Sequence, residues 1–196
     1  SVHKDIEVRM DVLGFCTQTR SMEYMTPKPV YDNIVLIGFM GSGKTSVGKA
    51  LKRQLYKKFV DVDTIIEAEE NASVSDIFQN KGEEYFRSLE QKCIHHLMQS
   101  TGQIISTGGG LPIYSSLSKK SLIVYINADF DVILNRLPTK ERDKRPLLQN
   151  ESKARALFEQ RKHVYEELAD FSVDANQSIP TFIHVIVDFV LDQRVL

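Results

Sequence analysis

A glycine-rich loop between an apolar run and an amphipathic segment restricts the possible folds of this chain more than any other stretch. Residues 34–37 are apolar, Gly38 ends the run, and the loop leads into Gly43, Lys44 and Thr45. Apolar residues then recur at helical spacing, at Val47, Ala50, Leu51 and Leu55. The stretch therefore predicts a strand, a loop and a helix, with the pattern G-x-x-x-x-G-K-[ST] at their junction.

This pattern is typical of a phosphate-binding loop. Glycines allow the backbone to curl until several N–H groups point at one anion, and the helix N-terminus adds a partial positive charge. In such a loop Lys44 would reach the outer phosphates of a nucleotide, and the Thr45 hydroxyl would hold Mg²⁺. The alternative is a simple glycine turn with a solvated lysine, but the strand–loop–helix setting favours nucleotide binding.

Composition and charge narrow the class of protein. The 196 residues are 42% hydrophobic and 26% charged, which is ordinary for one globular domain. A net charge of −1 offers no broad electrostatic surface for nucleic acid or an anionic membrane. Cys16 and Cys93 match neither a metal-binding spacing nor a disulfide framework, and no apolar run is long enough to span a membrane. Residues 1–11 are too acidic for a signal peptide, so we expect a cytoplasmic protein. From the charge and the lack of a long apolar run, we expect no nucleic-acid or membrane partners.

Predicted strands and helices alternate from Asn33 onward. The strands cover residues 34–37, 59–63, 103–106, 121–126 and 171–174. Helices are expected from Lys44, from about residue 64, after a cap at Ser73, and over residues 83–99, 129–137, 151–169 and 180–191. The alternation predicts an α/β fold, with a parallel sheet covered by helices on both faces. Residues 1–32 are interpreted as an appendage, and the charged residues 138–150 as a mobile loop.

Two further motifs follow predicted strands, so they should share the carboxyl edge of the sheet with the glycine-rich loop. Asp61 and Asp63 end one strand, with both side chains on the same face of an extended segment. They offer an outer Mg²⁺ ligand and a proton acceptor for a substrate hydroxyl, or they simply cap the next helix. Residues 108–110 are three glycines, which indicate close backbone approach to a ligand, with a bare tight turn as the alternative.

Three arginines are candidates for anion binding. Arg87 lies one helical turn from Glu83 and Glu90, where a helix-surface ion pair accounts for it. Arg145 belongs to the charged loop, and Arg161 to a late predicted helix. Taken singly, each is explained as a solvated charge, and composition assigns none of them a role.

Taken together, the motifs resemble the shikimate kinase family from Asn33 to the C-terminus. The matching stretches are Gly-Phe-Met-Gly-Ser-Gly-Lys-Thr at 38–45, Asp-Val-Asp at 61–63, Gly-Glu-Glu-Tyr-Phe-Arg at 82–87, Ser-Thr-Gly-Gly-Gly at 106–110, Lys-Arg-Pro-Leu-Leu at 144–148, and Arg161 before Tyr165. The resemblance implies ATP-dependent phosphorylation of the 3-hydroxyl of shikimate, a step on the pathway to chorismate and the aromatic amino acids. It also implies a three-layer α/β/α fold similar to nucleoside monophosphate kinases, with a five-stranded parallel sheet ordered 2-3-1-4-5 and a mobile lid.

The resemblance also implies catalytic roles for individual residues. Asp63 would orient or deprotonate the attacking hydroxyl, and Lys44 and Arg145 would neutralise charge on the transferring phosphoryl group. Thr45, with Asp61 acting through water, would hold Mg²⁺.

Binding roles carry over in the same way. Arg87 and Arg161 would bind the shikimate carboxylate, because a planar guanidinium fork suits a planar anion. Glu90 would brace Arg87, and the backbones of Gly109 and Gly110 would line the ring. Arg136 matches the arginine that stacks on adenine. The residues expected to contact ATP are Gly41, Ser42, Gly43, Lys44, Thr45, Ser46, Arg136, Arg145 and Asn176.

The resemblance divides the chain into a kinase-like domain, residues 33–196, and an N-terminal extension, residues 1–32, that the family's minimal domain lacks. Within the domain it implies a shikimate-binding region at about 61–95 and a lid at about 138–150. The stretch between Arg136 and Arg145 is longer than in some members. The expected partners are shikimate and ATP, and the expected state is a monomer.

Two alternatives remain. One is another small-molecule kinase of similar fold that acts on gluconate or a nucleoside monophosphate. Arg87 and Arg161 beside Asp63 favour a small hydroxy acid over a nucleotide. The other is a GTP-dependent switch, which needs a guanine-reading Asn-Lys-x-Asp. The Asn-Lys of this chain continues as Asn80-Lys81-Gly82-Glu83 and lacks that aspartate.

Overall fold

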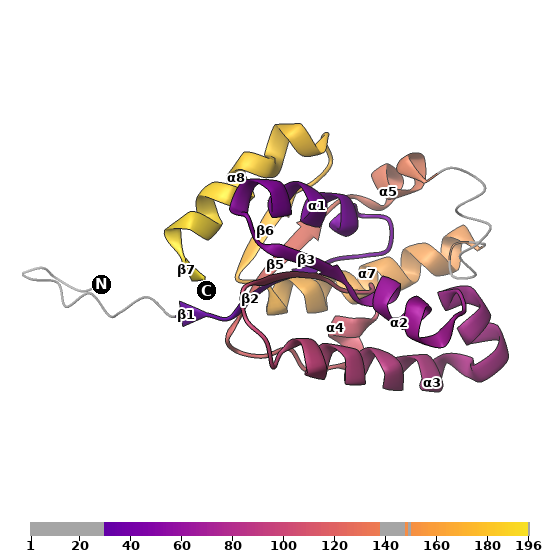
Figure 1. Cartoon of the computed structure of the whole chain (residues 1–196). Helices are drawn as coiled ribbons and strands as arrows, with labels where there is room; N and C mark the ends of the chain where they lie inside the picture. Colours follow the sequence, from indigo (N-terminus) through magenta and orange to yellow (C-terminus); the bar gives the residue numbers. More distant parts are fainter. Residues whose placement is uncertain (1–29, 138–147, 149, 196) are drawn as a thin grey trace, which may run out of the picture.

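A five-stranded parallel sheet forms the centre of the molecule (Figure 1). The computed structural model describes residues 30–137, 148 and 150–195. The strands of this sheet are β2 (Asn33–Ile37), β3 (Lys58–Asp61), β4 (Gln103–Ser106), β5 (Ser121–Asn127) and β6 (Phe171–Asp174). Their spatial order is β3-β4-β2-β5-β6, which is 2-3-1-4-5 when these five are counted along the chain. The predicted sheet is therefore confirmed.

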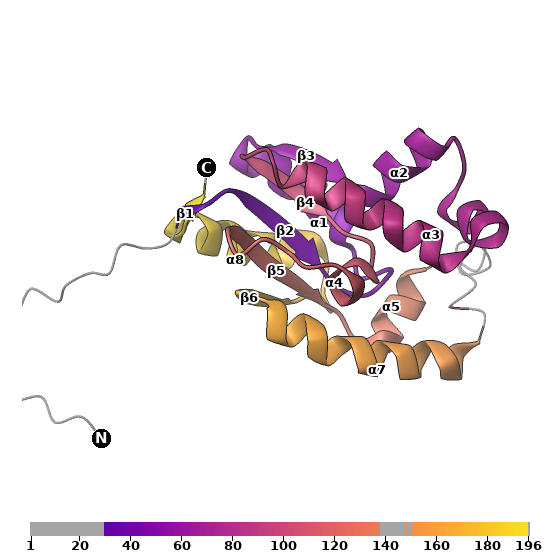
Figure 2. The ribbon, with the colours of Figure 1, turned by 90° about the horizontal axis from the view of Figure 1, so that it is seen from below.

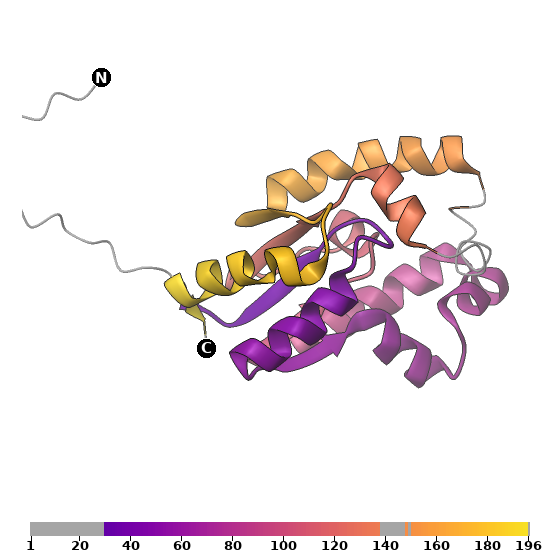
Figure 3. The same cartoon turned by 90° about the horizontal axis from the view of Figure 1, so that it is seen from above.

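Helices cover both faces of the sheet, as predicted. They are α1 (Lys44–Leu55), α2 (Val62–Glu70), α3 (Val74–Leu97), α4 (Leu111–Tyr114), α5 (Phe130–Arg136), α7 (Glu151–Leu168) and α8 (Ile179–Asp192). Helices α3, α4 and α7 lie on one face, seen from below in Figure 2. Helices α1 and α8 pack against each other on the opposite face, seen from above in Figure 3. In the described part of the chain, no helix has the length and apolar character that crossing a membrane requires.

The register of the sheet brings three loops to one edge. Leu36 of β2 pairs with Ser106 of β4, and Ser106 pairs in turn with Asp61 of β3. Because these strands are parallel and end at nearly the same level, the segments that follow them leave the sheet side by side. Those segments are the phosphate-loop motif, the glycine triplet and the acidic pair.

Two element boundaries differ from the prediction. Strand β3 ends at Asp61, and Asp63 lies in the first turn of α2. The placement of Asp61 and Asp63 on one extended face is therefore wrong, because the Asp61 side chain caps α2 and starts the helix earlier. The cap at Ser73 is confirmed, since its hydroxyl accepts a hydrogen bond from the Asp76 amide. Gly82, with φ 82° and ψ 168°, interrupts α3 just before residue 83, where the second of the two predicted helical segments begins.

The two ends of the described chain meet in a small second sheet. Strand β1 (Val30–Tyr31) pairs in parallel with β7 (Arg194–Val195). This pairing was not predicted, because a two-residue strand has no readable periodicity. The rest of the predicted appendage, residues 1–29, lies outside the described residues, as do residues 138–147 and 149 of the predicted lid.

The central strand is anchored by a buried asparagine. The Asn33 side chain is fully buried, and its Nδ2 donates to the Ser100 carbonyl at 2.7 Å. Its Oδ1 accepts from the Gln103 amide at 2.9 Å. Asn33 therefore ties the start of β2 to the turn before β4, upstream of the loop that β2 carries.

We expect Asn33→Ala to lower the free energy of unfolding by about 1–3 kcal/mol, because a buried backbone N–H loses its acceptor. Urea unfolding followed by circular dichroism measures the change. Gln99→Ala, at an exposed site in the same turn, serves as the control and should stay within about 0.5 kcal/mol of the unaltered protein. A loss at Asn33 no larger than that of the control would contradict this role.

Candidate active site

A cleft of about 420 Å³ opens where β2, β3 and β4 end. It brings together segments that are far apart in the sequence: the phosphate-loop motif, the acidic pair, the glycine triplet and the end of α5. The lining residues are 40–46, Asp61, Asp63, 106–109, Arg136, Leu137, 177–179 and Phe182. All predicted ATP contacts from Gly41 to Ser46 line this cleft.

The loop before α1 has the geometry of an anion cradle. Gly41 and Gly43 adopt φ values of 79° and 101°, which side-chain-bearing residues rarely adopt. Gly43 is the N-cap of α1 and has no side chain to cap the first helical amides, so the helix N-terminus is open to an anion. The buried Lys44 side chain lies over the loop, and its Nζ donates to the carbonyls of Gly38 and Phe39, each at 2.8 Å.

Thr45 and Asp61 lie together beside this loop. The Thr45 hydroxyl donates to Asp61 Oδ2 at 2.7 Å. The other oxygen, Oδ1, accepts from the amides of Asp63 at 3.1 Å and Thr64 at 3.4 Å. Asp61 is therefore both a helix cap and a neighbour of Thr45, so the two interpretations from the sequence are compatible. A hydroxyl and one carboxylate fit Mg²⁺, which usually takes one or two carboxylates and completes its shell with water and phosphate oxygens.

That donor set does not resemble a metal site built from protein ligands alone. Within residues 30–137, 148 and 150–195, no group of three or more His, Cys, Asp or Glu side chains could hold a metal ion. A cation at Thr45 and Asp61 would need further oxygen ligands from a bound nucleotide.

The glycine triplet packs directly against charged side chains. A Cβ atom on Gly108 would lie 2.7 Å from Glu90 Oε1 and 2.8 Å from Asp63 Oδ1. A Cβ atom on Gly110 would overlap the Arg87 guanidinium. Larger residues here would displace two carboxylates and an arginine, so the glycines are required by the protein's own side chains. The predicted approach of this backbone to a ligand stays a prediction.

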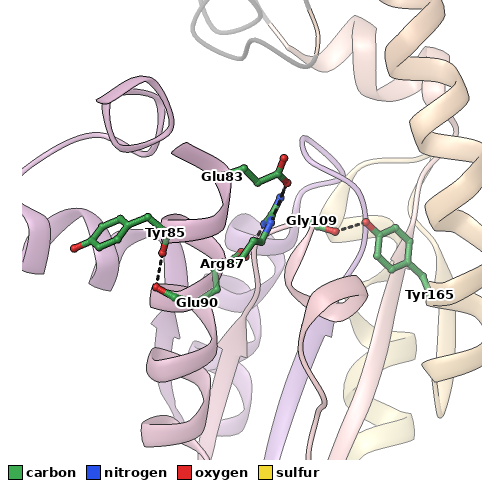
Figure 4. Close-up of polar contacts among 7 residues, drawn as sticks. Glu83, Tyr85, Arg87, Glu90, Gly109 and Tyr165 are labelled. Atoms are coloured by element: carbon green, nitrogen blue, oxygen red, sulfur yellow. Dashed lines mark hydrogen bonds and ion pairs between the residues drawn. The ribbon is translucent and has the colours of Figure 1, made fainter. Parts of the chain in front are cut away.

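Arg87 is held by two carboxylates from its own helix (Figure 4). Its Nη1 donates to Glu90 Oε2 at 2.5 Å, whereas its Nε and Nη2 both donate to Glu83 Oε1, at 3.2 and 2.9 Å. The Tyr114 ring stacks on the guanidinium, with its centroid 4.6 Å from Cζ. These contacts hold the guanidinium plane at one orientation beside Gly110.

Arg161 comes from α7 and is more deeply buried than Arg87, with 4% of its surface exposed. One turn later on α7, the Tyr165 hydroxyl donates to the Gly109 carbonyl at 2.5 Å (Figure 4). Burial raises the pKa of Tyr165 to about 12, and the charges of Arg161 and Arg87 act in the opposite direction. Both arginines therefore lie within electrostatic reach of one hydroxyl beside the glycine triplet, although neither lines the cleft itself.

Glu90 links the two arginines to Asp63. Its side chain is fully buried, and burial raises its pKa to about 7. The charge and hydrogen bond of Arg87 lower this pKa, Asp63 raises it, and Arg161 lowers it. Two carboxylates and two guanidiniums thus form one charge cluster behind the glycine triplet.

The far wall of the cleft combines the end of α5 with the loop before α8. Arg136 donates from Nη2 to the Gln177 carbonyl at 2.5 Å, and both residues line the cleft. Asn176 does not line it. The Asn176 side chain accepts from the Asp129 amide at 2.8 Å and donates to Asp129 Oδ2 at 3.1 Å, so it braces this loop against the start of α5.

Some site residues fall outside the prediction, and one predicted residue falls outside the described chain. Arg145 belongs to the residues that the structure does not describe. No role was predicted for Tyr165, Tyr114 or Gln177. For Tyr165 a signal existed, because it follows Arg161 by four residues and therefore shares its face of the helix.

Comparison with known proteins agrees with this geometry. The family model described as shikimate kinase matches residues 40–191. A shikimate kinase from Sulfurihydrogenibium sp. is 42% identical over 154 residues, which cover 76% of this chain and 91% of the relative. One from Helicobacter hepaticus is 38% identical over 148 residues, covering 75% and 89%.

A solved structure extends the comparison to three dimensions. Shikimate kinase from Acinetobacter baumannii, in complex with shikimate, superposes with a TM-score of 0.75 at 31% sequence identity. The superposition covers 83% of this chain and 94% of that protein. A family match across most of the chain, together with relatives of this identity, establishes that the chain belongs to the shikimate kinase family.

Proposed function

We propose that this cleft transfers the γ-phosphoryl group of ATP to the 3-hydroxyl of shikimate, giving shikimate 3-phosphate and ADP on the pathway to chorismate. The observation that carries the proposal is the position of Asp63. This carboxylate lines the same cleft as the phosphate loop and packs against Gly108, in the glycine triplet whose Gly110 packs against Arg87. The complex of the Acinetobacter baumannii relative with shikimate supports the substrate.

The acceptor side is assigned to Asp63 and the two arginines. Arg87 and Arg161 bind the carboxylate of shikimate through paired N–H donors, and the backbones of Gly109 and Gly110 lie against its ring. Asp63 accepts the proton of the attacking hydroxyl. The hydroxyl oxygen forms the new bond to phosphorus, and the bond from phosphorus to the β-phosphate oxygen breaks, so that ADP leaves with that electron pair.

The donor side is assigned to the loop from Gly41 to Ser46. Its amides and Lys44 bind the phosphates of ATP, and Lys44 neutralises charge on the transferring group. Arg136 contacts adenine, while Asn176 positions the loop beside it. Arg145 stays a prediction for the same phosphoryl charge, as part of a lid over residues 138–150.

Thr45 and Asp61 are the residues that would hold Mg²⁺. When bound, this ion neutralises charge on the β- and γ-phosphate oxygens. We also propose that the protein is a monomer, because one chain supplies every residue named above. The buried free thiol of Cys93 agrees with a reducing, cytoplasmic environment.

A phosphotransfer screen tests the function. With ATP and Mg²⁺, ADP release is expected with shikimate and not with gluconate or nucleoside monophosphates. Nucleoside monophosphates lack a carboxylate for the arginines, and the open chain of gluconate lacks the rigid ring that lies against Gly109 and Gly110. A coupled spectrophotometric assay measures turnover. Turnover with gluconate or a nucleotide but not with shikimate would overturn the proposal.

Asp63→Asn should lower kcat by about 10²- to 10⁴-fold, the usual contribution of a general base. The thermal unfolding midpoint should stay near that of the unaltered protein. Glu69→Gln removes a carboxylate from an exposed position of the same helix and should leave kcat unchanged. Near-normal turnover in Asp63→Asn would exclude Asp63 as the proton acceptor.

Glu90 is expected to make stability depend on pH. Its pKa rises from 4.5 to about 7 on folding, so between these values the folded state binds a proton that the unfolded state has released. Stability therefore falls as the pH rises from about 4.5 to about 7, by about 3 kcal/mol at about 1.36 kcal/mol per pKa unit, and levels off above this range.

The neutral Glu90→Gln variant should lack this dependence. Relative to the unaltered protein, its free energy of unfolding should increase between about pH 5 and about pH 8, measured by urea unfolding. A difference between the two proteins that does not change with pH would show that Glu90 is ionised throughout this range.

A further inference from the structure

The edge of Arg87 that best suits a carboxylate is already paired with Glu83. A guanidinium presents Nε and one Nη as two parallel donors, the geometry that a carboxylate matches with two oxygens. In Arg87 these two donors converge on a single oxygen, Glu83 Oε1, at 3.2 and 2.9 Å (Figure 4). The remaining contact, from Nη1 to Glu90 Oε2, uses the other side of the group.

The two carboxylates around Arg87 differ in how firmly they are held. The Glu90 side chain is 1% exposed, whereas the Glu83 side chain is 55% exposed. Glu83 also follows Gly82, whose φ of 82° breaks the helix and around which a Cβ would meet no atom within 4 Å. Glu83 can therefore leave Arg87 into solvent, whereas Glu90 is fixed in the interior.

We propose that Glu83 is an internal placeholder for the substrate carboxylate, which displaces it from the Nε–Nη2 edge of Arg87 when shikimate binds. This inference rests on the proposed role of Arg87 in binding that carboxylate. Until substrate arrives, Glu83 balances a guanidinium whose side chain is 14% exposed and keeps it oriented toward Gly110.

The exchange favours the substrate for a geometric reason. Glu83 satisfies two donors with one oxygen, whereas a free carboxylate can offer one oxygen to each donor. Ion pairs with an exposed partner contribute little, so displacing Glu83 costs only a small part of the binding energy. The placeholder also favours ligands with a planar two-oxygen anion over ligands that present a single negative atom.

A simpler role for Glu83 has to be separated from this one. A carboxylate just after Gly82 is favourable at the start of a helical segment, where the helix dipole is positive. Glu84 is exposed, shares that position, and forms no ion pair with any described residue. It therefore provides a matched control that removes the same charge one residue away from the Arg87 contact.

The test compares Glu83→Gln, Glu83→Ala and Glu84→Gln. Isothermal titration calorimetry gives the Kd for shikimate and for ATP, and initial rates give the KM for shikimate. Both Glu83 variants should bind shikimate roughly two- to fivefold more tightly, the strength of an exposed ion pair. The Kd for ATP should not change, which separates loss of the placeholder from a general change in the domain, and Glu84→Gln should match the unaltered protein.

The outcomes distinguish this inference from the proposed function. If the unaltered protein neither binds nor phosphorylates shikimate, the proposed function fails and the placeholder fails with it. If the unaltered protein turns over shikimate but the Glu83 variants bind it as Glu84→Gln does, the placeholder alone is overturned. Weaker binding in the Glu83 variants also overturns it, because Glu83 would then orient Arg87 for the substrate.

Discussion

The parallel register of β3, β4 and β2 is the constraint on which the rest of this structure depends. Asp61, Ser106 and Leu36 occupy one level of the sheet, so three chemically different segments begin at the same height. One contributes backbone amides, one carboxylates, and one a turn without side chains. No single segment offers all of these groups, but their common edge brings them into one cleft.

The glycine triplet, which follows β4, lets the charged side chains pack closely around one turn. Because Gly108 has no side chain, Asp63 and Glu90 approach the same backbone from two helices. Because Gly110 has none, Arg87 reaches the same turn, and Tyr165 fixes the carbonyl of Gly109 from the far side. The pKa of Glu90 depends on opposing effects. Burial and Asp63 raise it and favour the neutral form, whereas the two arginines lower it and favour the anionic form.

Much of the fold could be predicted from the sequence, because long apolar strands and capped helices carry their own periodic signal. The order of the five strands followed from the resemblance, and the parallel fold predicted that the motifs share one edge of the sheet. The position of Asp63 could not be predicted, because the sequence allows residues 61–63 to be either an extended strand end or the start of a helix. In the structure the helix forms, and the Asp61 side chain accepts hydrogen bonds from two of its amides. The pairing of β1 with β7 and the one-oxygen contact of Glu83 depend on tertiary placement that no local pattern encodes.

The crowding around Gly108 and Gly110 also limits how this enzyme could evolve. A wall formed by glycines cannot be reshaped by adding a side chain, since any larger residue at Gly108 or Gly110 collides with Glu90, Asp63 or Arg87. New acceptor preferences would have to arise elsewhere, and Tyr114, half-exposed and stacked on Arg87, is the neighbouring position with room to vary. The glycine triplet therefore tolerates little substitution, whereas Tyr114 in the short helix α4 that follows it can change.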